Sequence, residues 1–280
     1  MDLKRLANFP PWNWPPDIAN TLLAVLRDRE ADESDHLLAA EMAGEIVAIN
    51  DDLAGGLLSI VGDAAASEEL RSRAALSLGP VLEQMDTDSI GDLPGLDDDS
   101  FDAPPISEHT FHRIQQTLHA RYLEGDIPKE VRRRILEASV RAPADWHRDA
   151  IRKAYSSDDR DWRLTAVFAM RFVSGFDDEV VASLDDPDEE ISYEAVWAAG
   201  NWEIDAAWPH VSALLTAPAT DKVLLLAAIE AAGAIRPREA EPLLAELSDS
   251  EDTDIADAAD NAMMMASSPF DDDFDDESEL

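Results

Sequence analysis

The chain has 280 residues and a formal net charge of −39, because 61 acidic side chains outnumber 22 basic ones. It has no cysteine, which excludes disulfides, thiolate metal sites and cysteine nucleophiles and fits a reducing cytoplasm. A surface this negative repels nucleic acid and anionic membranes, and no stretch approaches the roughly 20 apolar residues of a membrane span. We therefore expect a cytoplasmic monomer that binds neither nucleic acid nor membrane.

The N-terminal segment NFPPWNWPPD sets two tryptophans between two pairs of prolines. Proline carries no amide donor, so we expect no helix here. We interpret residues 1–30 as a Pro/Trp arm and a capping helix, with the indoles covering the exposed core of the first repeat. The alternative is a recognition segment for a partner protein.

One helical pattern then recurs, with an apolar first position and small residues at the fifth and eighth positions. The clearest copy is ISYEAVWAAG, from Ile191, which follows an acidic turn. Its residues Ala195, Ala198 and Ala199 are three and four apart, so they share one stripe and let the next helix approach closely. Leucine-rich helices lie between the copies, and no alternating strand pattern appears. The copies begin at residues 36, 70, 131, 162, 191, 224 and 255, a period of roughly 30 residues with one double interval.

The acidic turn, the small residues and the period resemble HEAT repeats, and most closely the HEAT-like repeats named after phycobilisome lyases. LRSRAALSLG from Leu70, VRRRILEASV from Val131 and WRLTAVFAMR from Trp162 carry the resemblance best. It implies an all-α fold, a right-handed α-solenoid of about seven HEAT-like helical-pair repeats over residues 31–266. Repeats of this family serve mostly as protein-binding scaffolds and only occasionally as enzymes.

The double interval contains DTDSIGDLPGLDDDSFDAPP, which we interpret as an acidic loop insertion at 86–105. A helix is expected to follow, with Ser107 as its N-terminal cap. The last segment, residues 267–280, is acidic and is predicted to be a disordered tail. Its phenylalanines, Phe270 and Phe274, suggest a docking motif, and the alternative is a solubilising tail.

The only basic region of the chain is central and is densest between residues 129 and 153. Arginine forks bind carboxylates and phosphates, so we hypothesise a patch that binds an acidic segment of a partner, or the acidic loop or tail in cis. The alternative is local pairing with Glu130, Glu137, Asp145 and Asp149. The predicted patch consists of Arg132, Arg133, Arg134, Arg141 and Arg148, with Trp146 beside them.

Aromatic side chains cluster in the copy that begins at Ile191 and just after it. The alanine-rich helix of such repeats usually lines the concave face, where exposed tryptophan, tyrosine and arginine are typical of binding sites. The alternative is that the large rings fill space between repeats. The partner-binding candidates in this part of the chain are Tyr193, Glu194, Trp197 and Trp202.

No pattern for a metal, a cofactor or a catalytic triad emerges. The histidines at 109, 112 and 119 lack a carboxylate at a ligand spacing. Ser139, Asp145 and His147 are close in sequence, but only geometry defines a triad. We therefore expect no metal, no cofactor and no enzymatic activity.

These observations predict a non-catalytic scaffold or adaptor whose concave face binds an acidic or aromatic-containing segment of a protein partner. The alternative is a chromophore or small-ligand lyase or chaperone, which would need an apolar pocket lined by the tryptophans. A DNA-alkylation-repair glycosylase, which also has HEAT-like helices, would need a strongly basic groove that this composition does not offer.

Overall fold

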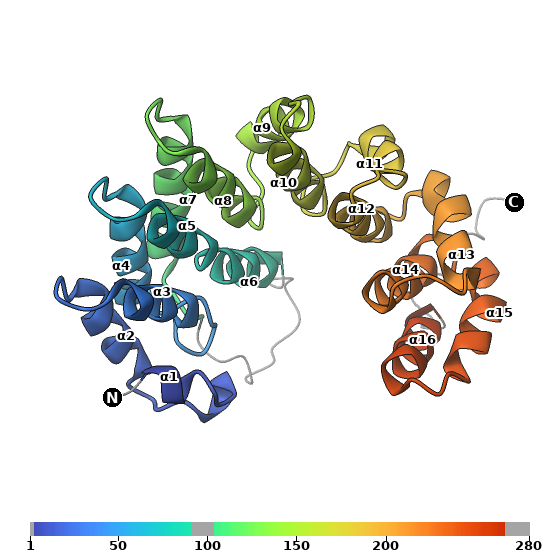
Figure 1. Ribbon diagram of the computed structural model, residues 1–280, viewed down its shortest axis with the longest axis horizontal. Helices are drawn as coiled ribbons and strands as arrows, with labels where there is room; N and C mark the ends of the chain where they lie inside the picture. Colours follow the sequence, from blue (N-terminus) through green and yellow to red (C-terminus); the bar gives the residue numbers. More distant parts are fainter. Residues whose placement is uncertain (1–2, 91–103, 267–280) are drawn as a thin grey trace, which may run out of the picture. The chain divides into compact units, whose positions relative to one another are not determined.

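The computed structural model describes residues 3–90 and 104–266, and its regular structure there consists of helices alone (Figure 1). The chain divides into two units, Met1–Ala150 and Ile151–Leu280, each with its own packing. The predicted acidic tail, with Phe270 and Phe274, lies outside the described residues. None of the described helices has both the length and the apolar character that crossing a bilayer requires.

The first unit stacks two layers of helices. The helices α3, α5 and α8 pack side by side in one layer, and α2, α4 and α7 form the other. Three of the predicted copies, at residues 36, 70 and 131, fall in α3, α5 and α8. The unit comprises α1 (Leu3–Leu6), the 3-10 turn η1 (Pro11–Asn13), α2 (Ile18–Arg27), α3 (Glu33–Met42), α4 (Asp51–Gly62), α5 (Glu68–Leu76), α6 (Gly79–Ile90), α7 (Glu108–Leu123) and α8 (Lys129–Ser139).

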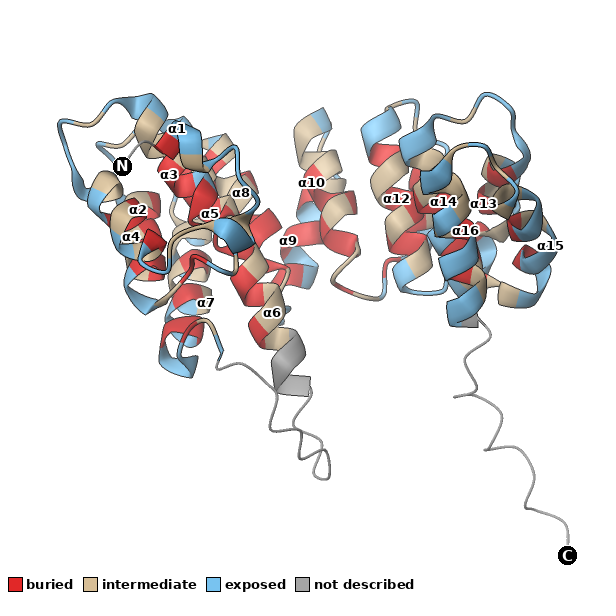
Figure 2. Ribbon diagram, turned by 90° about the horizontal axis from the view of Figure 1, so that it is seen from below, coloured by how far each residue is buried: buried red, intermediate tan, exposed pale blue. Residues whose placement is uncertain are grey.

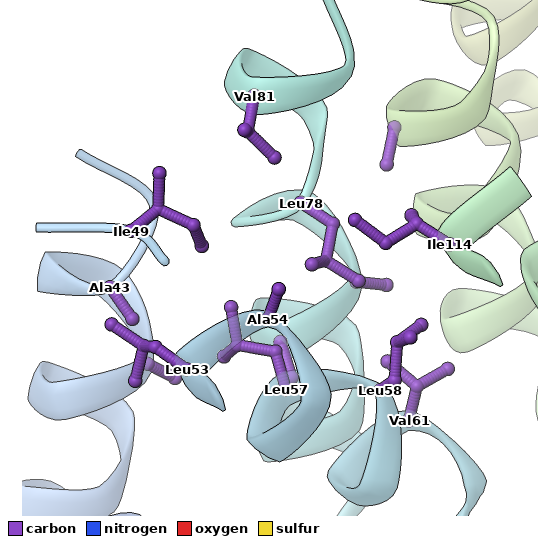
Figure 3. Close-up of a cluster of buried hydrophobic side chains, with 14 of the residues drawn as sticks. Ala43, Ile49, Leu53, Ala54, Leu57, Leu58, Val61, Leu78, Val81 and Ile114 are labelled. Carbon is purple, nitrogen blue, oxygen red and sulfur yellow. The ribbon is translucent and has the colours of Figure 1, made fainter. Parts of the chain in front are cut away.

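The core of this unit lies between the two layers. Leu53 and Leu57 of α4 belong to one cluster of buried side chains with Leu78, which precedes α6, and Ile114 of α7 (Figure 3). All four side chains are fully buried. Each buried leucine or isoleucine stabilises the fold by about 1.5–3 kcal/mol relative to an exposed one.

The second unit repeats the same arrangement. The helices α10, α12, α14 and α16 pack in sequence as one layer, with α11, α13 and α15 on the other side (Figures 1 and 2). The remaining four predicted copies fall in these four helices, which confirms the predicted α-solenoid class. The elements are α9 (Trp146–Tyr155), which holds residues of both units, α10 (Arg160–Met170), α11 (Asp177–Ser183), α12 (Glu189–Asn201), the 3-10 turn η2 (Asp205–Ala207), α13 (Trp208–Thr216), α14 (Lys222–Ile235), α15 (Pro237–Ser248) and α16 (Thr253–Ala266).

Small side chains bring these helices together, as the alanine stripe predicted. A Cβ atom added to Gly200 of α12 would lie 2.9 Å from the Cα atom of Ala231 in α14. One added to Gly233 of α14 would lie 3.1 Å from the Cβ atom of Ala262 in α16. The contact at Gly200 is with backbone and leaves no room for a larger residue, because packed helices yield little, whereas the contact at Gly233 is tight.

The acidic turns have two functions in the second unit. Asp159, Asp188 and Asp221 cap α10, α12 and α14, each accepting hydrogen bonds from backbone amides of the first turn. The aspartate at the start of one helix also pairs with a basic side chain at the start of the helix in the preceding copy. Arg160 donates to Asp188 at 2.6 and 2.9 Å, and Lys222 donates to Asp252 at 2.8 Å.

The structure changes two local predictions. The predicted loop begins too early, because α6 continues to Ile90; residues 91–103 lie outside the described part of the chain. The helix expected after it is α7, whose amide of Thr110 donates to the capping Ser107.

The proline-rich arm is not wholly without helix, since η1 forms one 3-10 turn with Pro11 at its start. Only one of the two indoles covers the core. Trp14 packs against it and donates to the carbonyls of Leu6 and Phe9 at 3.1 Å, whereas Trp12 is 78% exposed.

Candidate functional site

The predicted basic patch lies in the first unit, and its central member is not on the surface. Arg133 is 4% exposed and pairs with Glu130 at 2.6 Å and with Glu137 at 3.5 Å. Arg134 pairs with the same two carboxylates, at 2.7 and 2.6 Å. Desolvation lowers the pKa of Arg134, but the combined charge and hydrogen bonds of Glu137 and Glu130 outweigh it, so the pKa is raised. The prediction of an open patch is therefore wrong for Arg133, and local pairing with Glu130 and Glu137 is confirmed.

The other arginines of the predicted patch mostly join neighbouring helices. Arg132 donates to the carbonyls of Glu124 and Ile127, in the turn between α7 and α8. Arg141 binds Glu83 of α6. Arg148 lies exposed on α9. Two of these three side chains thus connect elements of the first unit.

Trp146 fills space between helices. Its ring stacks on His119 of α7 at 4.6 Å between centroids, with an interplanar angle of 11°. The rings of Tyr122 and His147 lie 5.0 and 3.9 Å away. This arrangement places Trp146 among packed rings rather than in an open patch.

Ser139 and His147 form a buried hydrogen-bonded pair, with Oγ and Nε2 3.0 Å apart. The amide of Ala144 donates to Nδ1 of His147 at 2.9 Å, so the ring proton resides on Nε2. The hydroxyl of Ser139 donates to the carbonyl of Leu136 at 3.2 Å and accepts from this Nε2–H. His147 in this tautomer has no free lone pair toward Ser139 and does not activate it as a nucleophile. Burial, reinforced by the charge of His119, lowers the pKa of His147 to about 4.

The aromatic candidates of the second unit gather around an arginine that sequence reasoning missed. The guanidinium of Arg171 lies 4.9 Å from the ring centre of Trp197 and 5.5 Å from that of Phe168. It also binds Glu194 at 2.9 Å. Tyr193 meets Trp197 edge-on, at 6.4 Å. The signal was present in the repeat: Arg171 occupies the tenth position of its copy, where Gly200 and Gly233 stand in the next two.

Trp202 ends α12 and ties it to the preceding copy. Its indole Nε1 donates to the carbonyl of Met170 at 2.7 Å, while the side chain of Asn201 donates to the carbonyl of Arg171 at 3.2 Å. Trp202 nevertheless remains 39% exposed. It is thus both a link between α10 and α12 and an accessible ring.

A groove of about 1320 Å³ crosses α12, α14 and α16, and we call it the α12–α14–α16 groove. Many of its lining residues are the small residues of these helices, residues of α15 also contribute, and Trp197 of α12 belongs to the lining. Sequence reasoning missed the groove, although Glu230 was conspicuous as the one charge in the apolar run VLLLAAIEAAGAI. The charged lining residues are Glu203, Glu230, Arg238, Glu241, Asp254 and Asp257.

Among the described residues, no group of three or more histidine, aspartate or glutamate side chains has an arrangement that would hold a metal ion. His119 is stacked on Trp146, and His112 faces Gln115.

Comparison with known proteins found no matching family model and no matching curated sequence. Two solved structures of HEAT-like helical-repeat proteins are similar at low identity. YibA of Escherichia coli is 16% identical with a TM-score of 0.47, over 91% of this chain and 84% of that one. Human deoxyhypusine hydroxylase, solved with glycerol, is 17% identical with a TM-score of 0.39, over 94% and 88%.

These likenesses concern the helical-repeat fold and do not extend to the finer resemblance to phycobilisome lyases. They also correct one prediction. The predicted absence of enzymatic activity, which rested on the lack of a catalytic motif, is contradicted, because the hydroxylase, at 17% identity, is an enzyme of the HEAT-like class.

Proposed function

We propose that this chain is a protein-interaction module that holds an extended or helical segment of a partner protein in the α12–α14–α16 groove. The observation that carries the proposal is the groove itself, about 1320 Å³ of open space over three successive helices. Its lining includes small residues such as Gly200, Gly233, Ala234 and Ala258, which are at least partly exposed and leave the groove open. Trp197 in its lining belongs to a residue type that dominates binding energy at interfaces.

The size and lining of the groove favour a peptide segment over a compact ligand. Small molecules are usually enclosed in pockets of about 300–1,000 Å³ with mostly apolar and aromatic walls. The groove is larger than that, and Trp197 is the one aromatic residue in its lining. A chromophore or small-ligand chaperone, which we expected to need several tryptophans around one pocket, therefore has less support than a peptide-binding module.

The proposal is tested by filling the groove. Ala234 lines it and is exposed on α14, so Ala234→Trp places a bulky ring in the groove without disturbing the core. Ala182→Trp, at an exposed position of α11 away from the groove, is the matched control. Both variants and the unmodified chain are used in affinity capture from a lysate of the source organism, with quantitative mass spectrometry and an absorbance spectrum of the eluate.

A protein captured by the unmodified chain and by Ala182→Trp, but lost with Ala234→Trp, is the expected result. Proteins captured equally by all three would show that the groove binds no partner. A coloured or small-molecule eluate that depends on the groove would replace the proposal by the ligand-handling alternative.

A further inference from the structure

The charge of the groove defines the chemistry of its occupant. We infer that the α12–α14–α16 groove takes a basic segment, in which lysine or arginine side chains accompany apolar ones. The inference rests on the function proposed above and specifies its partner. It differs from the acidic segment that the central arginines suggested, because Arg132, Arg133, Arg134 and Arg141 are engaged within the first unit.

The carboxylates of the groove outnumber its cations by five to one, since Arg238 is the single basic lining residue. Asp254 already accepts from Lys222 at 2.6 Å. The other four, Glu203, Glu230, Glu241 and Asp257, are exposed, and no cation among the described residues pairs with them. Like charges gathered around one groove repel each other, and a cationic ligand relieves that repulsion as it binds.

The floor of the groove suits the stems of such cations. Lysine and arginine bury their methylene chains on apolar surface while their charged ends stay in water. Leu226 and Ala258, which are partly exposed, and Ala234, which is exposed, provide apolar surface, and the carboxylates of Glu230 and Asp257 belong to the same lining. Met265, which is 80% exposed, adds a flexible thioether side chain that adapts to different neighbours.

The acidic C-terminal segment of the chain itself is a poor occupant. The last ten residues carry seven acidic side chains and no basic one, so the groove repels them. A second copy of this chain, at −39, is repelled in the same way. Charge complementarity therefore favours a different protein with a basic segment.

The test uses a displayed library of random peptides of about 12 residues, long enough to cross several helices at about 3.3 Å per extended residue. The library is selected on the unmodified chain at an ionic strength of about 0.15 M, where distant surface charges are screened. Recovered peptides are retained for analysis only if Ala234→Trp abolishes their binding and Ala182→Trp does not. The readout is their composition relative to the starting library.

One recovered peptide is then synthesised, together with a variant in which every lysine and arginine is replaced by glutamate. Dissociation constants are measured for the unmodified chain and for two double variants. Glu230→Gln with Asp257→Asn removes two charges from the groove, and Asp177→Asn with Asp178→Asn removes two exposed charges from α11. The second pair controls for the loss of net charge alone.

We expect groove-dependent peptides rich in lysine and arginine, with binding about 10-fold weaker after the groove substitutions and changed less than 3-fold after the control substitutions. Groove-dependent peptides that are neutral or acidic would overturn the inference and leave the proposed function intact. Recovery of no groove-dependent peptide would overturn both. Equal weakening by the two double variants would also overturn the inference, because net charge and not the groove would then explain the attraction.

Discussion

A single histidine links the stability of the first unit to pH. The pKa of His147 is lowered to about 4, chiefly by burial, against 6.5 for the unhindered group. Between these two values the unfolded chain binds a proton that the folded chain does not. The contribution of His147 to the free energy of unfolding is therefore fully present above about pH 6.5. As the pH drops from there toward 4, that contribution falls by about 1.4 kcal/mol per pH unit.

His147→Gln is expected to make this dependence shallower, because glutamine does not titrate and still offers a donor to Ser139 and an acceptor to the Ala144 amide. The measurement is the free energy of unfolding by urea at several pH values from about 7.5 to about 5, above the isoelectric point near 4.1. His112→Gln, at an exposed position, serves as the control and should leave the slope unchanged. An unaltered slope in His147→Gln would contradict the assignment.

At the level of single residues, sequence patterns gave the positions of buried alanines but not the partners of charged groups. Ala195, Ala198 and Ala199 are fully buried, as their spacing predicted. In the sequence, nothing in the spacing of Arg133 from its neighbours distinguishes it from an exposed arginine. Its burial depends on where the Glu130 and Glu137 carboxylates and the adjoining helices lie, and that information is three-dimensional.

At the level of helices, close approach between successive copies should limit what Gly200 tolerates. Alanine is the better helix former by about 1 kcal/mol, yet its Cβ atom would meet the backbone of Ala231 at 2.9 Å. Overpacking of this kind costs about 1–3 kcal/mol, so Gly200→Ala should lower the free energy of unfolding despite the gain in propensity.

The matched change is Gly55→Ala in α4, where the nearest atom is Nη2 of Arg113 at 3.1 Å, the mobile end of a long side chain. That variant should be stabilised by up to about 1 kcal/mol. Urea unfolding of both variants beside the unmodified chain measures the contrast. If both variants are stabilised, helix propensity and not packing decides, and the close approach of α12 and α14 has no energetic consequence.

The link from Trp202 to the preceding copy gives another test at this level. Trp202→Phe keeps an aromatic ring but removes the Nε1–H that donates to the Met170 carbonyl at 2.7 Å. We expect a loss of about 1 kcal/mol of stability, the usual net value of such a bond. Trp12→Phe, at a 78% exposed position, should change stability by less than about 0.5 kcal/mol. Equal effects of the two substitutions would show that this hydrogen bond between the copies adds nothing measurable to the free energy of unfolding.

Across the whole molecule, the seven helix copies could be predicted from sequence because each results from a local pattern repeated at one period. The α12–α14–α16 groove could not be predicted in this way. Glu203, Glu230, Glu241 and Asp257 are up to 54 positions apart, and only the stacking of the helices brings them into one lining. Counting charges along the sequence shows that this region is acidic, but it does not show that the acidic side chains line a groove.

The net charge of −39 sets the response of the whole chain to salt. Most of its ion pairs are at least partly exposed and contribute little, so repulsion between the unpaired carboxylates should dominate. Sodium chloride at about 1 M shortens the screening length from about 10 Å at 0.1 M to about 3 Å. We therefore expect the melting temperature to rise with salt, measured by calorimetry, while binding of a basic peptide in the groove weakens under the same conditions.

Potassium chloride at equal concentration should act alike, since the effect depends on ionic strength. A melting temperature that falls with either salt would show that the ion pairs between copies, such as Arg160 with Asp188, outweigh the repulsion.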